Sequence, residues 1–331
     1  MASQPGFVRE PASVRGLECV AQSVRYYVCH CPEVAERAIF HSAIPHAVDV
    51  KVTSLELPCP VCEALACFMA AHPECALYRC TSCGHAFSDT QVVAGVEQYD
   101  DDYYDKDHQR WFENPNIGLF ARIAAMIPNE REFSRVLDVG CGRGDFLRYL
   151  ARVRPGLALT GIDVAKLEPS ESIRFLRGDI LSASLGESFD IVVSLAVIEH
   201  VADVRKFARR LRELCRPGGL IVVMTVNEAS LMYWLARTLR RVGFSRAFDR
   251  LYGQHHLNHF THNSLRALWT SRNLQPLRHF THNGLLAATD IPASSMLSAF
   301  VLRCGVAGIM VAGKILNRMY LQTAVYRNPI R

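Results

Sequence analysis

The sequence predicts an α/β fold in which helices cover both faces of a parallel sheet, preceded by a small metal-binding ribbon. From Arg135 onward, short apolar runs typical of strands alternate with stretches that have helical apolar spacing. Two C-x-x-C pairs lie upstream of that region. Half of the 331 residues are apolar, which is enough for a sizeable buried core.

Residues 1–58 form an N-terminal extension of unclear fold, and their first sixteen residues lack the apolar run of a secretory signal. Twelve cysteines without such a signal favour reduced thiols and metal ligation over disulfides, so we expect a cytoplasmic protein. The apolar stretch at residues 291–313 is interrupted by Pro292 and Arg303. We therefore expect no membrane span, but peripheral contact with a membrane remains an alternative.

Residues 59–90 are expected to form a zinc ribbon. Two cysteine pairs, separated by seventeen residues, supply four thiolates: Cys59, Cys62, Cys80 and Cys83. Four thiolates complete a tetrahedral zinc site and leave no open position, so the metal would be structural. Gly84 suits the tight turn after the second pair, whereas Glu63 follows the first. Cys67 and Cys75 lie inside the loop and are alternative ligands.

Residues 91–130 are expected to form an acidic and aromatic connector that ends in the helical stretch IGLFARIAAMI. Five strands follow, in the stretches RVLDVG, LALTGIDV, IRFLRGDI, FDIVVSLAV and LIVVMTVN. Helical stretches such as GDFLRYLARV and ADVRKFARRLRELC separate them. Short strands joined by crossover helices indicate a parallel sheet, whose ligand sites lie at the carboxyl ends of the strands.

A glycine-rich loop follows the first of these strands. The stretch VLDVGCGRGDFL places Gly140, Gly142 and Gly144 between a strand and a helix, where the backbone can closely approach a ligand. The spacing G-x-G-x-G differs from the G-x-G-x-x-G of dinucleotide sites, which disfavours an NAD-dependent oxidoreductase. Asp138 would repel a pyrophosphate, but it suits a ligand that carries an ammonium and a sulfonium. S-adenosylmethionine is such a ligand.

These motifs, in this order, resemble those of class I S-adenosylmethionine-dependent methyltransferases over residues 130–282. The layout of ribbon, tyrosine-rich connector and catalytic domain is similar to the Methyltransf_23 type. The resemblance implies a Rossmann-like, seven-stranded methyltransferase sheet within a domain at residues 131–331. It also implies a set of cofactor-binding residues: Asp138, Gly140, Cys141, Gly142, Gly144, Asp163, Asp179, Leu195 and Tyr104.

Within that set, the resemblance gives the side chains different roles. Asp163 would accept hydrogen bonds from both ribose hydroxyls, and Asp179 would accept one from the adenine amino group. Tyr104, together with Tyr99 and Tyr103, would lie over the donor, where an aromatic face attracts a sulfonium. A solvated linker is the alternative for each tyrosine.

Two histidines are candidates for a general base, since a histidine of near-neutral pKa can accept a proton from an acceptor hydroxyl. Glu199 and His200, in SLAVIEHV, match the Glu-His pair common after the fourth strand of this family, and His200 is the first candidate. The second is His256, because HHLNHFTHNSL resembles the family segment E-H-L-x-Y-F-S-x-x-S-L. There His255 replaces the usual acidic residue and His259 the usual aromatic one. A structural hydrogen-bonding role is the alternative for His200.

Insertions at residues 227–258 and 285–313 are expected to cap an acceptor pocket. Their apolar composition favours an acceptor with a hydrophobic part, although ordinary core packing would explain it too. The leading interpretation is methyl transfer, by in-line displacement, to a small-molecule, glycan or lipid-like acceptor. The glycan is included because zinc-containing sugar C-methyltransferases share the ribbon and the Glu-His pair, although they have a long extra C-terminal domain that this sequence lacks.

Two other functions are weighed against this interpretation. In the first, an RNA or protein methyltransferase would use the ribbon to hold a macromolecule. However, the ribbon contains one Lys or Arg, and the basic stretches elsewhere have the spacing of solvated helix faces, so a nucleic-acid partner is disfavoured. In the second, a non-catalytic module would bind the donor without a base, which the intact Glu-His pair disfavours.

The pentapeptide HFTHN occurs twice, starting at His259 and at His279. In the first copy, Thr261 is expected to cap the helix SLRALWTSRN. In the second, LRHF is expected to end a strand, with Asn283 and Gly284 forming the turn. A metal site made of these histidines is disfavoured, because the four cysteines are better zinc ligands.

Overall fold

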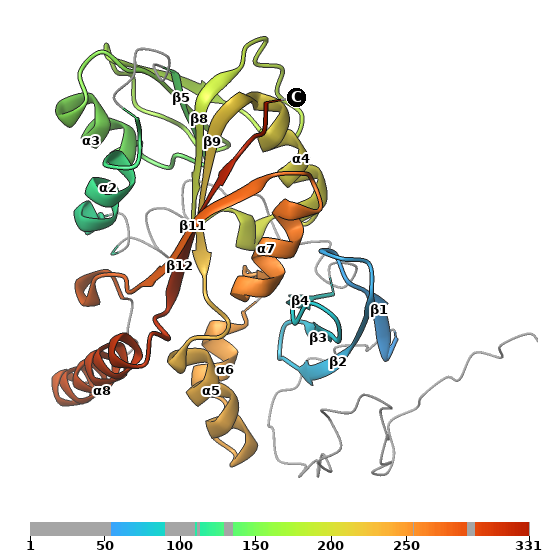
Figure 1. Ribbon diagram of the computed structural model, residues 1–331. Coiled ribbons are helices and arrows are strands. Elements are labelled where there is room, and N and C mark those ends of the chain that lie inside the picture. The colour runs from blue at the N-terminus through green and yellow to red at the C-terminus, as the bar shows by residue number, and fades with distance from the viewer. Residues whose placement is uncertain are drawn as a thin grey trace, which may run out of the picture. The chain divides into compact units, whose positions relative to one another are not determined.

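The computed structural model of the protein describes residues 54–89, 110, 113–128, 135–253, 255–289 and 295–330 (Figure 1). Most of the N-terminal extension lies outside these residues. Tyr99, Tyr103 and Tyr104 lie outside them too, so the expected aromatic cover over the donor stays a prediction.

A seven-stranded sheet organises the larger part of the described chain, in the strand order β11-β12-β9-β8-β5-β6-β7. The strands are β5 (Arg135–Val139), β6 (Ala158–Asp163), β7 (Ile173–Arg177), β8 (Phe189–Leu195), β9 (Cys215–Val226), β11 (Gln275–His282) and β12 (Leu321–Arg327). Neighbouring strands from β9 to β7 pair in parallel, whereas β12 is antiparallel to both β9 and β11. The five strands expected from the sequence are all present, and the predicted sheet is confirmed.

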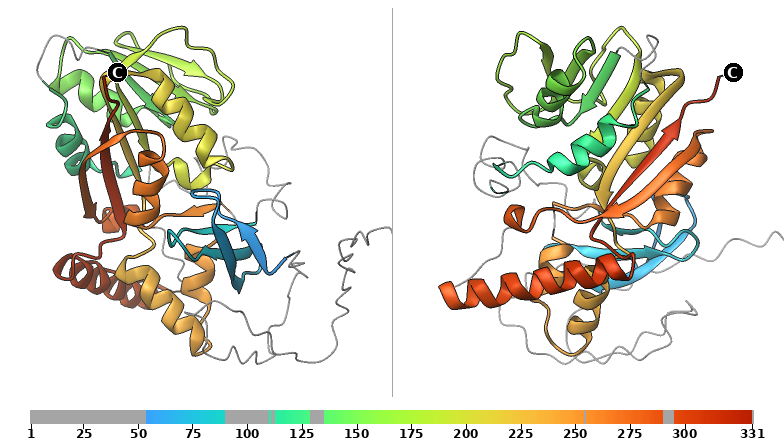
Figure 2. Two further views of the ribbon diagram at one scale, coloured as in Figure 1. Left: turned by 45° about the vertical axis from the view of Figure 1, so that its right-hand side comes forward. Right: turned by 60° about the vertical axis from the view of Figure 1, so that its left-hand side comes forward.

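Helices cover both faces of this sheet, as the two views in Figure 2 show. On one face, α2 (Ile117–Ala124) contacts α3 (Asp145–Val153), which packs on β6 and β7. On the other, α4 (Val204–Leu214) packs on β8 and β9 and contacts α7 (His262–Thr270). Consecutive residues of a strand point to opposite faces of the sheet, and both faces are apolar. Val136 therefore packs in the hydrophobic core on the α3 side, and Leu137 packs in the core on the α4 side.

The cysteine-rich region forms a second, antiparallel sheet from β1 (Glu56–Pro58), β2 (Leu65–Ala71), β3 (Ala76–Cys80) and β4 (Ala86–Ser88). Its fifth strand, β10 (Asn258–His259), comes from the part of the chain that also forms the seven-stranded sheet. Asn258 pairs with Phe87 and His259 with Ala86. The ribbon therefore shares a sheet with the first copy of HFTHN.

Two helical segments correspond to the expected insertions. The first contains α5 (Leu231–Arg241) and α6 (Arg246–Leu251). The second contains a short 3-10 helix (Leu286–Ala288) and α8 (Met296–Ile315), and α8 contacts α5. Pro292 precedes α8 instead of interrupting it, so α8 is long and apolar enough to cross a membrane, with 6% of its most apolar window buried. This differs from the expectation of an interrupted stretch.

Candidate functional site

A cavity opens beside the glycine-rich loop at the carboxyl ends of the strands. The empty space within it is about 700 Å³, which includes open solvent at its mouth. Five of the predicted cofactor-binding residues line it: Asp138, Gly140, Cys141, Gly142 and Leu195. Sequence reasoning missed the other lining residues: Asn114, Pro115, Asn116, Leu119, Phe120, Arg143, Asp145, Phe146, Met224, Leu285 and Ala288.

The glycines of the loop are required by both backbone conformation and space. Gly140 and Gly144 have φ angles of 69° and 78°, in the left-handed region that disfavours other residues. A Cβ atom on Gly140 would lie 2.3 Å from Cγ2 of Val197, in the segment after β8. At Gly144 it would lie 2.5 Å from Cζ of Phe175. Gly144 therefore allows α3 to pack on β7 and does not line the cavity.

Asp163 holds the loop in place. Its Oδ2 accepts a hydrogen bond of 2.7 Å from the Gly142 amide, and its Oδ1 accepts one of 3.0 Å from the Ala165 amide. Asp179 is exposed, and its Oδ1 accepts from the Leu181 amide at 2.9 Å. Neither carboxylate lines the cavity. Each oxygen has a second lone pair, so their expected roles toward ribose and adenine stay predictions.

Asp138 is the one predicted cavity residue with an unsatisfied side chain. It is 2% exposed, and its Oδ1 has no hydrogen-bond partner within the described ranges. Burial, with a smaller contribution from the charge of Asp163, raises the pKa of Asp138 to about 8. A buried carboxyl without a partner is costly, and a cationic ligand group beside it would favour its ionised form.

The Glu-His pair lies in a 3-10 helix, Ile198–His200, directly after β8. The turn into it passes through Ala196, whose φ of 58° is unusual for a residue with a side chain. Glu199 is 2% exposed and accepts a hydrogen bond of 2.8 Å from Oγ1 of Thr225. Burial raises the pKa of Glu199 to about 7.

His200 and His256, the two candidate bases, lie together, with ring centroids 5.0 Å apart. Nδ1 of His200 lies 2.6 Å from the carbonyl oxygen of His255. Because a carbonyl only accepts hydrogen bonds, Nδ1 carries the proton, and Nε2 is the basic nitrogen of the neutral ring. Neither histidine lines the cavity beside the glycine loop.

The two HFTHN copies have different environments. In the first, Thr261 caps α7 in a capping box with Ser264, as predicted. His259 is fully buried, with Nδ1 3.1 Å from the Tyr233 hydroxyl, and burial lowers its pKa well below the usual value. In the second copy, β11 continues to His282, so the strand is longer than expected. The copies touch where the His262 and His279 rings lie 3.9 Å apart.

The four predicted metal ligands form the one group of metal-binding type found in the described part of the chain. The Sγ atoms of Cys59, Cys62, Cys80 and Cys83 all lie within 4.8 Å of one another. Cys59 and Cys83 are 3.7 Å apart and Cys62 and Cys80 3.5 Å, close to the ~3.8 Å between sulfurs bound tetrahedrally at about 2.3 Å. Cys67 and Cys75 are not in the group.

The turns after both cysteine pairs have the same backbone conformation. Glu63 adopts a φ of 64° and Gly84 one of 72°. Glu63 therefore occupies a position that suits glycine, and it forms an exposed ion pair with Arg205.

The ribbon contacts the histidine-bearing segments through side chains that sequence reasoning did not single out. Nε2 of His85, next to the second cysteine pair, lies 3.1 Å from Oδ1 of Asn258. Asn258 in turn donates a hydrogen bond of 2.7 Å to the carbonyl of Val201, which follows His200. The ring of Phe260 lies 4.5 Å from that of His85.

A buried carboxylate joins the ribbon to α5 and α6. Glu228 is 1% exposed and forms ion pairs with Arg79 of β3 and Arg237 of α5. The hydroxyl of Tyr252 donates to it at 2.6 Å. These partners are far apart in the sequence, and no local motif indicates them.

The sheet order, the glycine loop and the buried carboxylate before it together define a class I S-adenosylmethionine-dependent methyltransferase domain. Residues 109–279 match the model of the methyltransferase domain family Methyltransf_23, and the chain belongs to this family.

Individual relatives match shorter segments. A ubiquinone biosynthesis O-methyltransferase of Brucella anthropi is 38% identical over 112 residues, which cover 31% of this chain and 45% of that protein. An uncharacterized methyltransferase of Mycobacterium tuberculosis is 38% identical over 130 residues, 37% of this chain and 64% of that one. The chain spans about half the length of the curated relatives it matches.

Among solved structures, phosphoethanolamine N-methyltransferase 2 of Haemonchus contortus aligns loosely. The TM-score is 0.49 at 15% identity, over 71% of this chain and 61% of that one.

Proposed function

We propose that this protein transfers a methyl group from S-adenosylmethionine to a small molecule that has a hydrophobic part. The observation that carries the proposal is the buried Oδ1 atom of Asp138, which lies in the cavity beside the glycine loop and has no hydrogen-bond partner among the described residues. A positively charged group beside Asp138 would stabilise its ionised carboxyl, and the ammonium group of the donor is such a group. Gly140 and Gly142, which also line the cavity, would let the backbone of the loop approach the donor closely.

The remaining donor contacts would come from the next strands. We propose Asp163 for the ribose hydroxyls and Asp179 for the adenine amino group. Leu195, which lines the cavity, would pack against the methionine end. Gly144 would act through the packing of α3. Cys141 lines the cavity, and burial raises the pKa of its thiol. The thiol therefore stays protonated and would contact the donor only through packing.

When bound, the donor supplies an electrophilic methyl group on a sulfonium, and transfer removes that positive charge. This chain's residues hold the reacting atoms in line and exclude water. The acceptor atom forms the new bond to carbon as the carbon–sulfur bond breaks. We propose that Nε2 of His200 takes the acceptor's proton, with His256 as the alternative base and Glu199 as the buried group that positions the turn.

A hydroxyl acceptor is supported by the similarity to the Brucella relative, which is a ubiquinone biosynthesis O-methyltransferase. A hydrophobic part is supported by the exposed apolar surface of α5 and α8. The macromolecular alternative is disfavoured by the ribbon's arginine, because Arg79 forms an ion pair with Glu228. We propose that the protein acts in the cytoplasm and contacts a membrane.

We propose that the four cysteines bind a structural zinc ion. The separation of their sulfurs suits tetrahedral coordination, and four thiolates leave no position for a substrate. The metal would stabilise the ribbon and, through β10, the segment that carries His256.

The decisive experiment incubates the protein with methyl-labelled S-adenosylmethionine and cell extract, followed by separation of lipid, small-molecule, RNA and protein fractions. Label in the lipid or small-molecule fraction is expected, and label confined to RNA or protein would refute the proposal. With the acceptor in hand, His200→Gln should lower turnover at least tenfold with donor affinity unchanged, in line with general-base effects of about 100-fold or more. His282→Gln, a histidine away from the pair, is the matched control.

A further inference from the structure

Helix α8 is apolar around its whole circumference, but within the described part of the chain only one side of it is covered. Among its 20 residues, Gly313 is buried, and the rest are partly or fully exposed. Its most apolar window has a mean hydropathy of 1.8. The outward side presents large apolar side chains: Met296, Leu297, Phe300, Val301, Leu302, Val311 and Ile315. A helix that is apolar all round belongs in a protein core or in a membrane environment.

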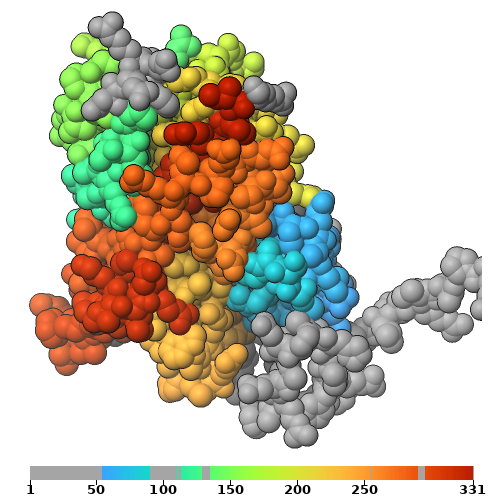
Figure 3. Space-filling model, viewed as in Figure 1, coloured from blue at the N-terminus to red at the C-terminus, as the bar shows by residue number. Residues whose placement is uncertain are grey.

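Exposed apolar side chains also lie in α5 and in the residues that follow it. Trp234 is 45% exposed, Val242 is 66% exposed and Phe244 is 69% exposed. Since α5 contacts both α6 and α8, these side chains and the outward side of α8 are called the α5–α8 surface. Figure 3 shows α5, α6 and α8 close together at one end of the methyltransferase unit.

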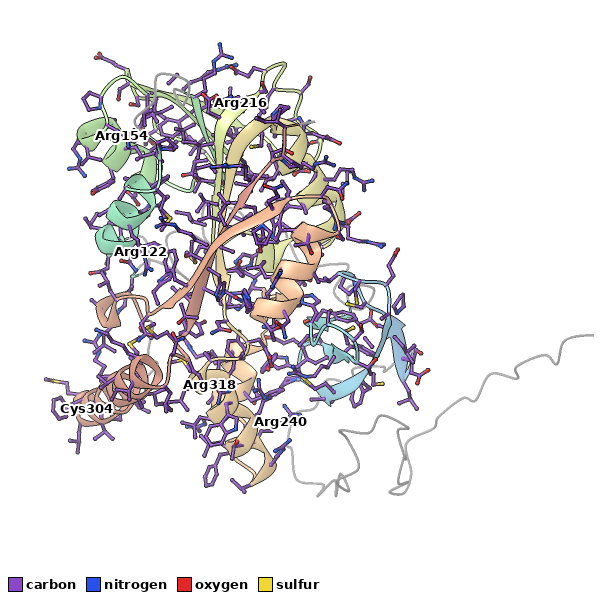
Figure 4. The ribbon with its side chains drawn as sticks, in the orientation of Figure 1. Arg122, Arg154, Arg216, Arg240, Cys304 and Arg318 are labelled. Carbon is purple, nitrogen blue, oxygen red and sulfur yellow. The ribbon has the colours of Figure 1, made fainter. Side chains whose placement is uncertain are left out.

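The charged residues of these helices are almost all basic. Exposed basic side chains lie in or beside them: Arg241, Arg246, Arg250, Arg303 and Lys314. The one acidic residue in α5, α6 and α8 is Asp249, which accepts from Ser245 at 2.6 Å and lies 3.5 Å from Arg240. Figure 4 labels Arg240 near the end of α5 and Cys304 on α8. The α5–α8 surface therefore combines exposed apolar groups with positive charge.

We propose that the α5–α8 surface docks onto an anionic lipid bilayer, with α8 lying in the interface instead of crossing the membrane. Exposed apolar groups would enter the acyl region, while the arginines would contact lipid phosphates. Contacts with α5 and with the 3-10 helix Leu286–Ala288 keep α8 alongside the domain. The segment that carries α8 connects β11 to β12, and its two ends lie side by side in the sheet, where His282 pairs with Leu321.

Docking would bring the cavity close to lipid. Leu285 and Ala288 line the cavity, and the 3-10 helix that contains Ala288 contacts α8. If the proposed function holds, on which this consequence rests, the acceptor is a lipophilic molecule that reaches the site from the bilayer. The docking surface itself does not depend on methyl transfer.

The test measures co-sedimentation of the full chain with vesicles of phosphatidylglycerol and phosphatidylcholine, and with vesicles of phosphatidylcholine alone. We expect binding to the anionic vesicles that weakens as salt is raised. Val301→Asp should weaken it at least tenfold. Arg241→Glu should weaken it by more than about fivefold, the value of one basic residue at an anionic surface. Val153→Asp, on α3 and 45% exposed in the wild type, is the matched control and should bind normally.

Three results would overturn the proposal: equal binding to neutral vesicles, unchanged binding by Val301→Asp, or resistance of bound protein to alkaline extraction, which indicates a spanning helix. A dimer that Val301→Asp dissociates, without vesicle binding by the wild type, would assign the surface to a second copy instead. Calorimetry of donor binding on the same samples separates the two proposals. Failure of the wild type to bind S-adenosylmethionine refutes the proposed function and leaves docking intact.

Discussion

Replacing Asp138 by asparagine should make the protein more stable and a weaker binder of its donor. The folded carboxyl has a pKa near 8, raised from 3.8 by burial and by Asp163. Below about pH 4 the carboxyl is protonated in both the folded and unfolded chains. Above that pH the unfolded chain loses the proton while the folded chain keeps it, so wild-type stability falls as pH rises toward 8.

The size of the effect follows from the shift. Each pH unit between the two pKa values lowers the free energy of unfolding by about 1.4 kcal/mol. Between pH 6 and pH 8, the wild type should lose about 2 kcal/mol relative to Asp138→Asn, because the folded carboxyl is half ionised near pH 8. The variant cannot ionise at this position, and Oδ1 of the wild type has no hydrogen-bond partner in the described residues to lose.

The assay is urea unfolding, followed by tryptophan fluorescence at pH 6, 7 and 8, with and without S-adenosylmethionine. Without the donor, the stability difference should grow with pH in favour of the variant. With saturating donor, the variant's advantage should shrink by about 1.4 kcal/mol or more, since losing a buried contact to a charged group weakens binding by roughly tenfold or more. Glu171→Gln, at an exposed carboxyl, is the control. A difference that does not change with pH would refute the assigned pKa.

Three further predictions concern the ribbon and its contacts. Removing the metal with a chelator should unfold the ribbon and shift the NMR signals of His200 and His256, because β10 pairs with β4 of the ribbon. The glycine loop does not pair with the ribbon, so donor affinity measured by calorimetry should change less than about threefold. Unshifted histidine signals would contradict the proposed link between the ribbon and these histidines. Glu228→Gln should lower the free energy of unfolding by about 3 kcal/mol in urea titrations, because two arginines lose a buried partner. The control, Glu187→Gln, removes a more exposed ion pair and should change the free energy of unfolding by less than about 1 kcal/mol. Thr261→Ala should cost about 1 kcal/mol through loss of the α7 cap, and Thr261→Ser almost nothing; equal losses would disprove capping.

The parallel sheet was predictable because its signals are local. Strands such as β5 and β8 are short apolar runs bounded by turns, and both of their faces are buried, so every residue contributes to the pattern. The residues that line the cavity beside the glycine loop were predictable for a similar reason. Asp138 and the glycines lie within one strand–loop–helix unit, where spacing alone brings them together.

The grouping of the two candidate bases depends on contacts between distant segments, and the sequence indicates these residues but not their arrangement. His200 and His256 were both singled out, yet their proximity results from the carbonyl of His255 reaching His200. The two-residue strand β10 has no periodicity to detect. In the sequence, Glu228 resembles a solvent-exposed acidic residue of a loop, because its ion-pair partners, Arg79 and Arg237, are not in the same motif.

Helix α8 illustrates a different limit. Its apolar composition is plain in the sequence, but composition does not tell which side of a helix a protein covers. The sequence predicts that this stretch and the first insertion together cap an acceptor pocket. In the structure, α8 contacts α5 of that insertion, and its opposite side is exposed.

The pairing of β4 with β10 has a consequence for how the chain is made. During synthesis, the ribbon emerges long before its partner strand, since His85 and Asn258 are 173 positions apart. Until then, β4 is an open sheet edge, able to pair with the edge of another chain. A truncated gene product that ends before Asn258 would keep this edge exposed permanently. A product that begins after the ribbon would instead leave Glu228 without Arg79. The ribbon produced without β10 should therefore associate with other chains, whereas the remainder should lose one ion pair of Glu228 and keep its fold.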